Sequence, residues 1–199
     1  MSHQDVLHGS NLDLLAAVRD NFAHAVVTDP PYGLGFMGKD WDSALPDPRT
    51  WAECLRVLRP GGHLVAFGAP RLVHRLTCQI EDAGFEVRDQ LLWLFGSGFP
   101  KSLDVSKAID AAAGAVRERV MVPTKPGNKH EQAGPIALGA SGMRDVSAPA
   151  SPEAARWSGW GTALKPAYES IVLARKPLDG TVAQTVQRWG TGAINVDGC

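Results

Sequence analysis

The chain has 199 residues, of which 44% are hydrophobic and 21% are charged, and its formal net charge is −1. This composition is that of a globular protein with one sizeable core. It excludes a globally basic surface, so any contact with nucleic acid has to rest on a local patch. The three cysteines, at positions 54, 78 and 199, form no closely spaced pair, which argues against a zinc site and a disulfide framework.

Targeting signals are not evident in the sequence. The first residues lack the basic and apolar regions of a signal peptide, and no apolar run approaches the length that spans a membrane. Widely spaced cysteines suit a reducing compartment. We therefore expect a cytoplasmic protein with no membrane partner.

Short apolar runs alternate with amphipathic stretches along the first half of the chain. The apolar runs predict strands over residues 6–10, 25–28, 63–67 and 85–95. The amphipathic stretches predict helices over residues 12–19, 48–58 and 72–83. Strands that alternate with helices are typical of a parallel sheet with helical crossovers. We expect the turn over residues 59–62, Arg-Pro-Gly-Gly, to end the second of these helices.

The second half of the sequence is less regular. A helix is expected in the first part of residues 103–122, after which Pro, Gly, Ser and Ala dominate residues 123–160 and predict a loop. An apolar run over residues 170–174 predicts a further strand, and residues 182–188 predict a short helix.

One tetrapeptide, Asp29-Pro30-Pro31-Tyr32, combines residue types that suit a chemical task. Its acid follows the strand expected over residues 25–28. Each proline fixes its own φ and disfavours helix for the residue before it. Neither proline has an N–H, so the result is a rigid group of acceptors beside an aromatic ring. Such a corner suits a planar ring that carries an NH2 group.

The same four residues are also compatible with an ordinary turn, since Asp and Pro are common at strand ends. The loop over residues 33–42 favours a functional interpretation. It is rich in Gly and contains Trp41, as is typical of a ligand-facing loop at the carboxyl end of a strand.

The tetrapeptide resembles the catalytic motif of the S-adenosylmethionine-dependent DNA amino-methyltransferases, which methylate adenine N6 or cytosine N4. The resemblance implies an α/β fold with a Rossmann-like methyltransferase sheet, mostly parallel, with helices on both faces, here incomplete. It implies S-adenosylmethionine as the cofactor and double-stranded DNA as the partner, from which the target base is flipped before reaction. Asp at the first motif position favours adenine over cytosine.

The resemblance also implies roles for the four residues of the motif. The Asp29 carboxylate and the Pro30 carbonyl would accept the two N–H groups of the target amine. Pro31 would stiffen the corner, and Tyr32 would stack on the base. This chemistry depends on positioning and electrostatics and needs no metal.

Neighbouring stretches supply further candidates. The resemblance implies that Asp29, Phe67 and Gly68 contact the cofactor. Gly68 is equally compatible with an ordinary turn. Phe36 and Trp41 are candidates for lining the substrate pocket, with core packing favoured for Phe36.

The resemblance divides the chain into a catalytic core over residues 1–122, a target-recognition insert or loop over 123–160, a return strand over 161–180 and a tail over 181–199. Lys101 follows a Gly-Ser-Gly-Phe-Pro loop that is expected to face the substrate. It is a candidate phosphate contact, or else an ordinary surface lysine.

The glycine-rich cofactor loop of the family is not evident after Ala174, where this order of motifs would place it. The stretch over residues 95–98, Phe-Gly-Ser-Gly, resembles that loop but is one position short. We therefore expect a truncated chain whose missing part lies in a C-terminal half or a second polypeptide. A homodimer also stays open.

Two alternatives stay open for the function. The first is a methyltransferase for cytosine N4, RNA or a protein glutamine. Asp29 argues against glutamine, because glutamine-modifying relatives usually carry Asn at that position. The second is a truncated remnant that binds DNA without catalysis, which the missing cofactor loop supports.

Overall fold

The computed structural model describes residues 4–35, 40–95, 102–123, 143–164 and 167–198. The chain divides into two compact units. The first unit comprises Met1–Trp93 and Glu169–Cys199, and the second comprises Leu94–Tyr168. Each unit is described by itself.

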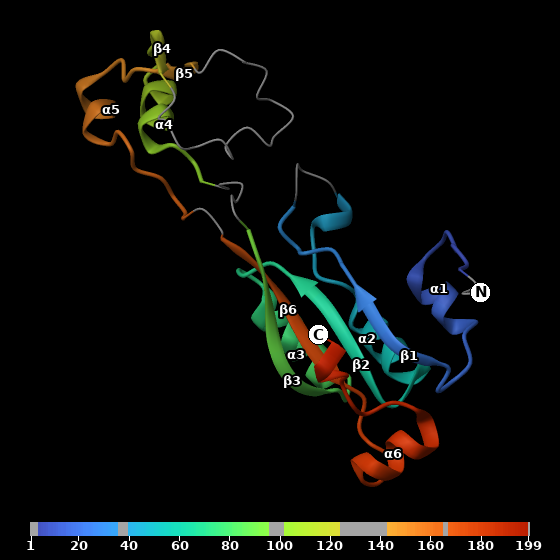
Figure 1. Cartoon of the computed structure of the whole chain (residues 1–199). Helices are drawn as coiled ribbons and strands as arrows, with labels where there is room; N and C mark the ends of the chain where they lie inside the picture. The colour runs from blue at the N-terminus through green and yellow to red at the C-terminus, as the bar shows by residue number, and fades with distance from the viewer. Residues whose placement is uncertain (1–3, 36–39, 96–101, 124–142, 165–166, 199) are drawn as a thin grey trace. The chain divides into compact units, whose positions relative to one another are not determined.

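The first unit is built on a four-stranded sheet, shown in Figure 1. Its strands, in spatial order, are β1 (Ala23–Thr28), β2 (Leu58–Gly68), β6 (Tyr168–Arg175) and β3 (Glu86–Leu94). Strands β1 and β2 are parallel, whereas β6 runs antiparallel to β2.

Strand β3 also runs antiparallel to β6. The side chain of its first residue, Glu86, forms an ion pair with Arg175 at the end of β6. At the other end, the N–H of Phe95 donates to the carbonyl of Ala167, just before β6. Strands β1, β2 and β3 therefore share one direction, and β6 opposes them.

Helices α2 (Pro48–Val57) and α3 (Val73–Asp82) of the first unit pack on the sheet because their apolar residues recur on one face. Helix α6 (Val182–Trp189) contacts β2, and α1 (Asn11–Ala16) packs on α2. The unit also has two short 3-10 turns, η2 (Asp40–Asp42) and η3 (Val196–Gly198). The core joins α2 and α3 to the sheet through buried side chains of Trp51, Cys54, Leu58, Leu64, Ala66, Leu76, Ile80, Phe85, Val172 and Ala174. Burial of each large apolar side chain contributes about 1.5–3 kcal/mol.

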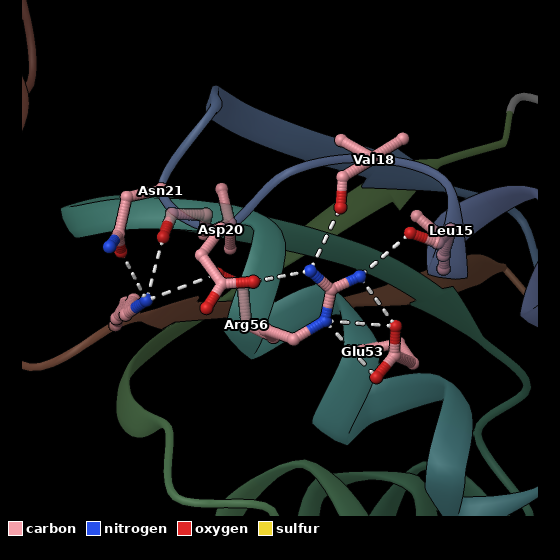
Figure 2. A network of polar contacts seen from close by, with 8 residues as sticks. Leu15, Val18, Asp20, Asn21, Glu53 and Arg56 are labelled. Carbon is pink, nitrogen blue, oxygen red and sulfur yellow. Dashed lines mark hydrogen bonds and ion pairs between the residues drawn. The ribbon is translucent and has the colours of Figure 1, made fainter.

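Arg56, in the last turn of α2, fixes the segment between α1 and β1 (Figure 2). Its guanidinium donates to the carbonyls of Leu15 and Val18 over 2.7 and 2.8 Å, so it binds carbonyls at and just after the end of α1. It also forms ion pairs with Asp20 and Glu53. These contacts fix where β1 begins.

Lys176, just after β6, continues this network. Its ammonium donates over 2.8 Å to both the side-chain oxygen of Asn21 and the carbonyl of Leu58. Asn21 lies in the left-handed region, with φ of 55°, in the turn before β1. One lysine thus ties together the start of β1, the start of β2 and the end of β6.

The second unit contains α4 (Val105–Ala112), the antiparallel hairpin β4 (Arg119–Pro123) and β5 (Met143–Ser147), and α5 (Pro152–Arg156). The buried carboxylate of Asp110 in α4 holds it together. That carboxylate accepts the N–H of Ala150 over 2.9 Å and the hydroxyl of Ser151 over 2.7 Å, and lies 3.2 Å from Nε of Arg117. These donors hold the pKa of Asp110 below its ordinary value, the Ala150 N–H most strongly.

The structure confirms the predicted α/β fold. Three of the four strands share one direction, but the sheet is mixed, because β6 runs antiparallel to both of its neighbours. The strands expected over residues 25–28, 63–67, 85–95 and 170–174 are present as β1, β2, β3 and β6. The helices expected over residues 12–19, 48–58, 72–83 and 182–188 are present as α1, α2, α3 and α6, with shifted ends. Within the described ranges, no helix has the length and apolar character needed to cross a membrane.

Two local predictions are wrong. No strand forms over residues 6–10, where Val6 is 96% exposed. The loop expected over residues 123–160 includes β5 and α5. The helix α2 ends at Val57, just before residues 59–62, as predicted. These residues then belong to β2, where the Gly61 N–H donates to the carbonyls of Lys176 and Pro177.

The expected division into a core over residues 1–122 and a recognition insert over 123–160 is a functional one and stays a prediction. The compact units divide at different places, between Trp93 and Leu94 and between Tyr168 and Glu169.

We predict that Asp110→Asn lowers the thermal stability of the protein at neutral pH. The pKa of Asp110 is lower in the folded than in the unfolded state, so its ionised form stabilises the fold above the unfolded value of about 4. That stabilisation is lost as pH falls. The difference in melting temperature between wild type and variant should therefore shrink in acid, as followed by circular dichroism.

Glu153→Gln is the matched control, because Glu153 is an exposed carboxylate of the same unit. Equal melting temperatures for Asp110→Asn and Glu153→Gln at neutral pH would contradict the role of Asp110.

Candidate functional site

The carboxyl ends of β1 and β2 and the first residues of β6 meet at one end of the sheet. Thr28 of β1 pairs with Ala66, and Gly68 of β2 pairs with Ser170. Asp29 directly follows β1, and Glu169 is the second residue of β6. The two carboxylates therefore lie on either side of the end of β2, although they are far apart in the sequence.

The phenol of Tyr32 lies near both carboxylates. Its hydroxyl is close enough to Glu169 and Asp29 for both to act on its pKa. Burial of the phenol, followed by these two contacts, raises the pKa of Tyr32 above its ordinary range. The phenol therefore keeps its single proton, which it can donate to one of these carboxylates at a time.

Asp42 stabilises the backbone that follows the motif. Its carboxylate is almost fully buried and accepts the N–H groups of Tyr32 over 2.6 Å and Gly33 over 3.1 Å. Its own carbonyl accepts the N–H of Gly35 over 2.7 Å. Gly33 and Gly35 have φ of 69° and 61°, a conformation that side chains disfavour. Asp42 thus holds a tight loop of two left-handed glycines.

The other predicted site residues have different surroundings. Phe67 is half-buried and Gly68 is buried at the end of β2. A Cβ at Gly68 would lie 2.8 Å from a methyl group of Leu76, so packing of α3 already accounts for this glycine. Trp41 is 63% exposed in η2. Phe36 and Lys101 lie outside the described residues.

The structure therefore brings Asp29, Tyr32, Phe67 and Gly68 to one end of the sheet, and their functional roles stay predictions. It adds Glu169, which no sequence pattern singles out. A glutamate at the start of an antiparallel strand carries no local motif, and only the strand order places it near Asp29. Asp42 was part of the expected loop but had no assigned role.

The site offers several fixed acceptors beside one aromatic ring. A carboxylate has about four lone-pair sites, so Asp29 can accept the Tyr32 hydroxyl and still accept further N–H donors. These acceptors and the ring are suited to binding and orienting a planar amine through hydrogen bonds and stacking.

Among the described residues, no group of three or more His, Cys, Asp or Glu side chains could hold a metal ion.

No family model matches the chain, and no curated protein matches it. Among solved structures, it is similar to a complex of M1.HpyAVI with SAM, at 14% identity and a TM-score of 0.43, covering 87% of this chain and 53% of that one. It is also similar to TTHA0409, a putative DNA modification methylase from Thermus thermophilus, at 20% identity and a TM-score of 0.44, covering 85% and 52%.

A third structure, the [4+2]-cyclase SpnF, has 18% identity and a TM-score of 0.36, with 85% and 54% covered. The chain thus spans about half the length of these proteins.

We predict that Tyr32 resists ionisation in the folded protein. The chain has two tyrosines, so Tyr168→Phe leaves Tyr32 as its one phenol. Tyrosine ordinarily ionises at about pH 10. At that pH the tyrosinate absorbance of Tyr32 should be absent from the folded protein, and it should appear only on unfolding. Because the pKa of Tyr32 is higher in the folded than in the unfolded state, its neutral form contributes fully to the free energy of unfolding below about pH 10. That contribution is lost as pH rises further.

In the Tyr168→Phe background, Glu169→Gln should move the ionisation of Tyr32 towards its ordinary pH, because one of the two facing carboxylates is gone. Glu81→Gln, on the exposed side of α3, is the control and should leave it unchanged. Ordinary ionisation of Tyr32 in protein that circular dichroism shows to be folded would contradict the contact.

Proposed function

We propose that this protein transfers a methyl group from S-adenosylmethionine to the exocyclic amine of a base flipped out of double-stranded DNA, with adenine N6 favoured. The observation that carries the proposal is the convergence of Asp29, Tyr32 and Glu169 at the carboxyl ends of β1 and β2. In sheets of this kind, ligands bind outside the carboxyl ends of parallel strands.

Asp29 would act as the main acceptor for the target amine. An exocyclic amine is a weak nucleophile because its lone pair is delocalised into the ring. Acceptance of its N–H groups by the Asp29 carboxylate and the Pro30 carbonyl would draw the nitrogen towards tetrahedral geometry. Pro31 would keep that carbonyl in place, since it restricts the backbone conformation of Pro30.

Tyr32 would provide the stacking surface for the flipped base. A base leaving the duplex costs a few kcal/mol, and stacking on one aromatic ring contributes about 1–3 kcal/mol. The nearness of the Tyr32 hydroxyl to Glu169 and Asp29 supports this role, because donation to either carboxylate would orient the ring before a base arrives. Asp42 supports it as well, since it binds the Tyr32 N–H.

The residues present fit a cationic cofactor. S-adenosylmethionine carries a sulfonium and an ammonium group, and the end of the sheet presents the carboxylates of Asp29 and Glu169 beside the half-buried Phe67. Carboxylates and aromatic rings both attract such cations. When bound, the cofactor supplies an electrophilic methyl group. Asp29, Phe67 and Gly68 are the proposed contacts.

DNA as the substrate, and adenine as its base, rest on the resemblance of the Asp29–Tyr32 motif. Cytosine N4, RNA and protein glutamine are the alternative acceptors, and Trp41, Phe36 and Lys101 are the proposed substrate contacts. Because the chain spans about half the length of the similar structures, the proposal includes a further segment or second polypeptide, or a homodimer, as a source of missing cofactor contacts.

We predict saturable binding of S-adenosylmethionine to the protein in titration calorimetry, weakened by Asp29→Ala because one carboxylate beside the cation is lost. This experiment separates the enzyme from the alternative of a remnant that binds DNA without catalysis. Absence of binding would contradict a catalytic role for this chain by itself.

For catalysis, we predict that Asp29→Ala lowers incorporation of labelled methyl into DNA by at least about 100-fold, by analogy with the loss of one preorganised polar contact in an active site. Asp82→Ala, on the exposed end of α3, is the matched control and should retain activity. Equal incorporation by the Asp29 and Asp82 variants would overturn the assignment. Incorporation into RNA or protein instead of DNA would identify one of the alternative acceptors.

A further inference from the structure

Asp42 is a buried carboxylate to which the proposed chemistry gives no step. Its side chain belongs to a residue that is 3% exposed, and burial of a carboxylate is costly unless hydrogen bonds compensate its charge. One oxygen, Oδ1, accepts both the N–H of Tyr32 over 2.6 Å and the N–H of Gly33 over 3.1 Å. Hydrogen bonds to a charged acceptor are stronger than those between neutral groups. The charge of Asp42 is therefore balanced in part by the backbone that ends the Asp29–Tyr32 motif.

The two prolines of the motif make these hydrogen bonds important. Neither Pro30 nor Pro31 has an N–H, so neither can be held through a backbone donor. The N–H groups of Tyr32 and Gly33 are the first donors that follow, and both donate to Asp42. The peptide bonds between described residues are trans, so the carbonyl of Pro31 points away from Asp42. Asp42 thus sets the direction of the peptide that joins the proline corner to Tyr32.

The main chain of Asp42 binds the same loop. Its carbonyl accepts the N–H of Gly35 over 2.7 Å. Gly33 lies between these contacts in a left-handed conformation, and a Cβ there would lie 3.1 Å from the backbone nitrogen of Leu45 and 3.2 Å from the carbonyl carbon of Ala44. The segment after η2 therefore packs directly against the end of the motif. Asp42 holds the loop through both its side chain and its main chain, in a place where the backbone has little room to move.

We propose that Asp42 is a positioning residue for the methyl transfer. Through the N–H groups of Tyr32 and Gly33, it sets the orientation of the Tyr32 ring and of the proline carbonyls, and it does not itself touch the substrate. This inference rests on the proposed function and adds a residue to which the resemblance assigns no role. In a reaction that depends on positioning, a displacement of about 1 Å costs about 100-fold in rate. Loss of the Asp42 acceptor therefore acts on the chemical step and not on the affinity for S-adenosylmethionine.

The test compares two substitutions of similar size. Asp42→Leu fills the space and removes the acceptor, whereas Asp42→Asn keeps an oxygen that can accept both N–H groups. Asp42→Leu should lower kcat for methyl transfer to DNA by about 100-fold, with an unchanged Kd for S-adenosylmethionine in titration calorimetry. Asp42→Asn should stay within about fivefold of the wild-type kcat, because it loses only the charge of the acceptor. Asp40→Leu, in the same turn and exposed, is the control and should behave like wild type.

Amide hydrogen exchange provides a readout that needs no activity. In wild type the amides of Tyr32 and Gly33 should be protected, and in Asp42→Leu they should exchange about tenfold faster or more, as followed by NMR of labelled protein. Asp42→Asn should keep most of the protection. Fast exchange of both amides in wild type would overturn the proposal, whether or not Asp42→Leu folds.

Three kinetic outcomes would also overturn it. The first is a wild-type kcat for Asp42→Leu. The second is an equal loss of kcat in Asp42→Leu and Asp42→Asn, because the acceptor would then not matter. The third is a loss of affinity for S-adenosylmethionine as large as the loss of kcat, which would reveal a general defect of the site. Absence of methyl transfer by wild type would instead refute the proposed function, so the two failures are distinguishable.

Discussion

The antiparallel direction of β6 is the constraint on which the site depends. Strands β1 and β2 are parallel and therefore end on the same side of the sheet, where a ligand site is expected. A further parallel strand beside β2 would also end there. Because β6 is antiparallel, it begins there instead, and its second residue brings Glu169 to Tyr32. Lys176, at the other end of β6, binds the start of β2 and so stabilises the same arrangement.

Local patterns in the sequence were sufficient for most of the first unit. Trp51, Cys54 and Leu55 of α2 recur at helical spacing, and the apolar run in β2 is buried between two neighbours. The start of β2 was harder to predict than the end of α2, because Gly61 has the φ of a turn but donates its N–H to carbonyls after β6. A long-range hydrogen bond of this kind leaves no local signal. The hairpin β4–β5 was not predicted for the same reason, because its two strands are far apart in the sequence and pair across a long connection.

In the candidate site, too, some residues could be predicted from local sequence and others could not. Asp29 and Tyr32 could be predicted because the prolines fix the backbone between them, so their spacing in the sequence already restricts their geometry. Glu169 was not evident, because its proximity depends on strand order alone. Asp42 lies between these cases. It is close to the motif in sequence, but its burial and its bonds to the Tyr32 and Gly33 N–H groups appear only when the loop is folded.

The distribution of charge in the sequence limits how the proposed DNA substrate could be held. Carboxylates beside Tyr32 suit an amine, but they repel phosphate groups, and the unit that holds them has a net charge of −4. Affinity for a DNA backbone cannot therefore come from the net charge of the first unit. Residues 94–168 have the opposite sign, with nine Lys or Arg against six Asp or Glu and so a net charge of +3, and this excess comes from lysines that lie outside the described residues. The proposed methyl transfer to DNA therefore requires that cations other than the groups around Tyr32 hold the phosphates.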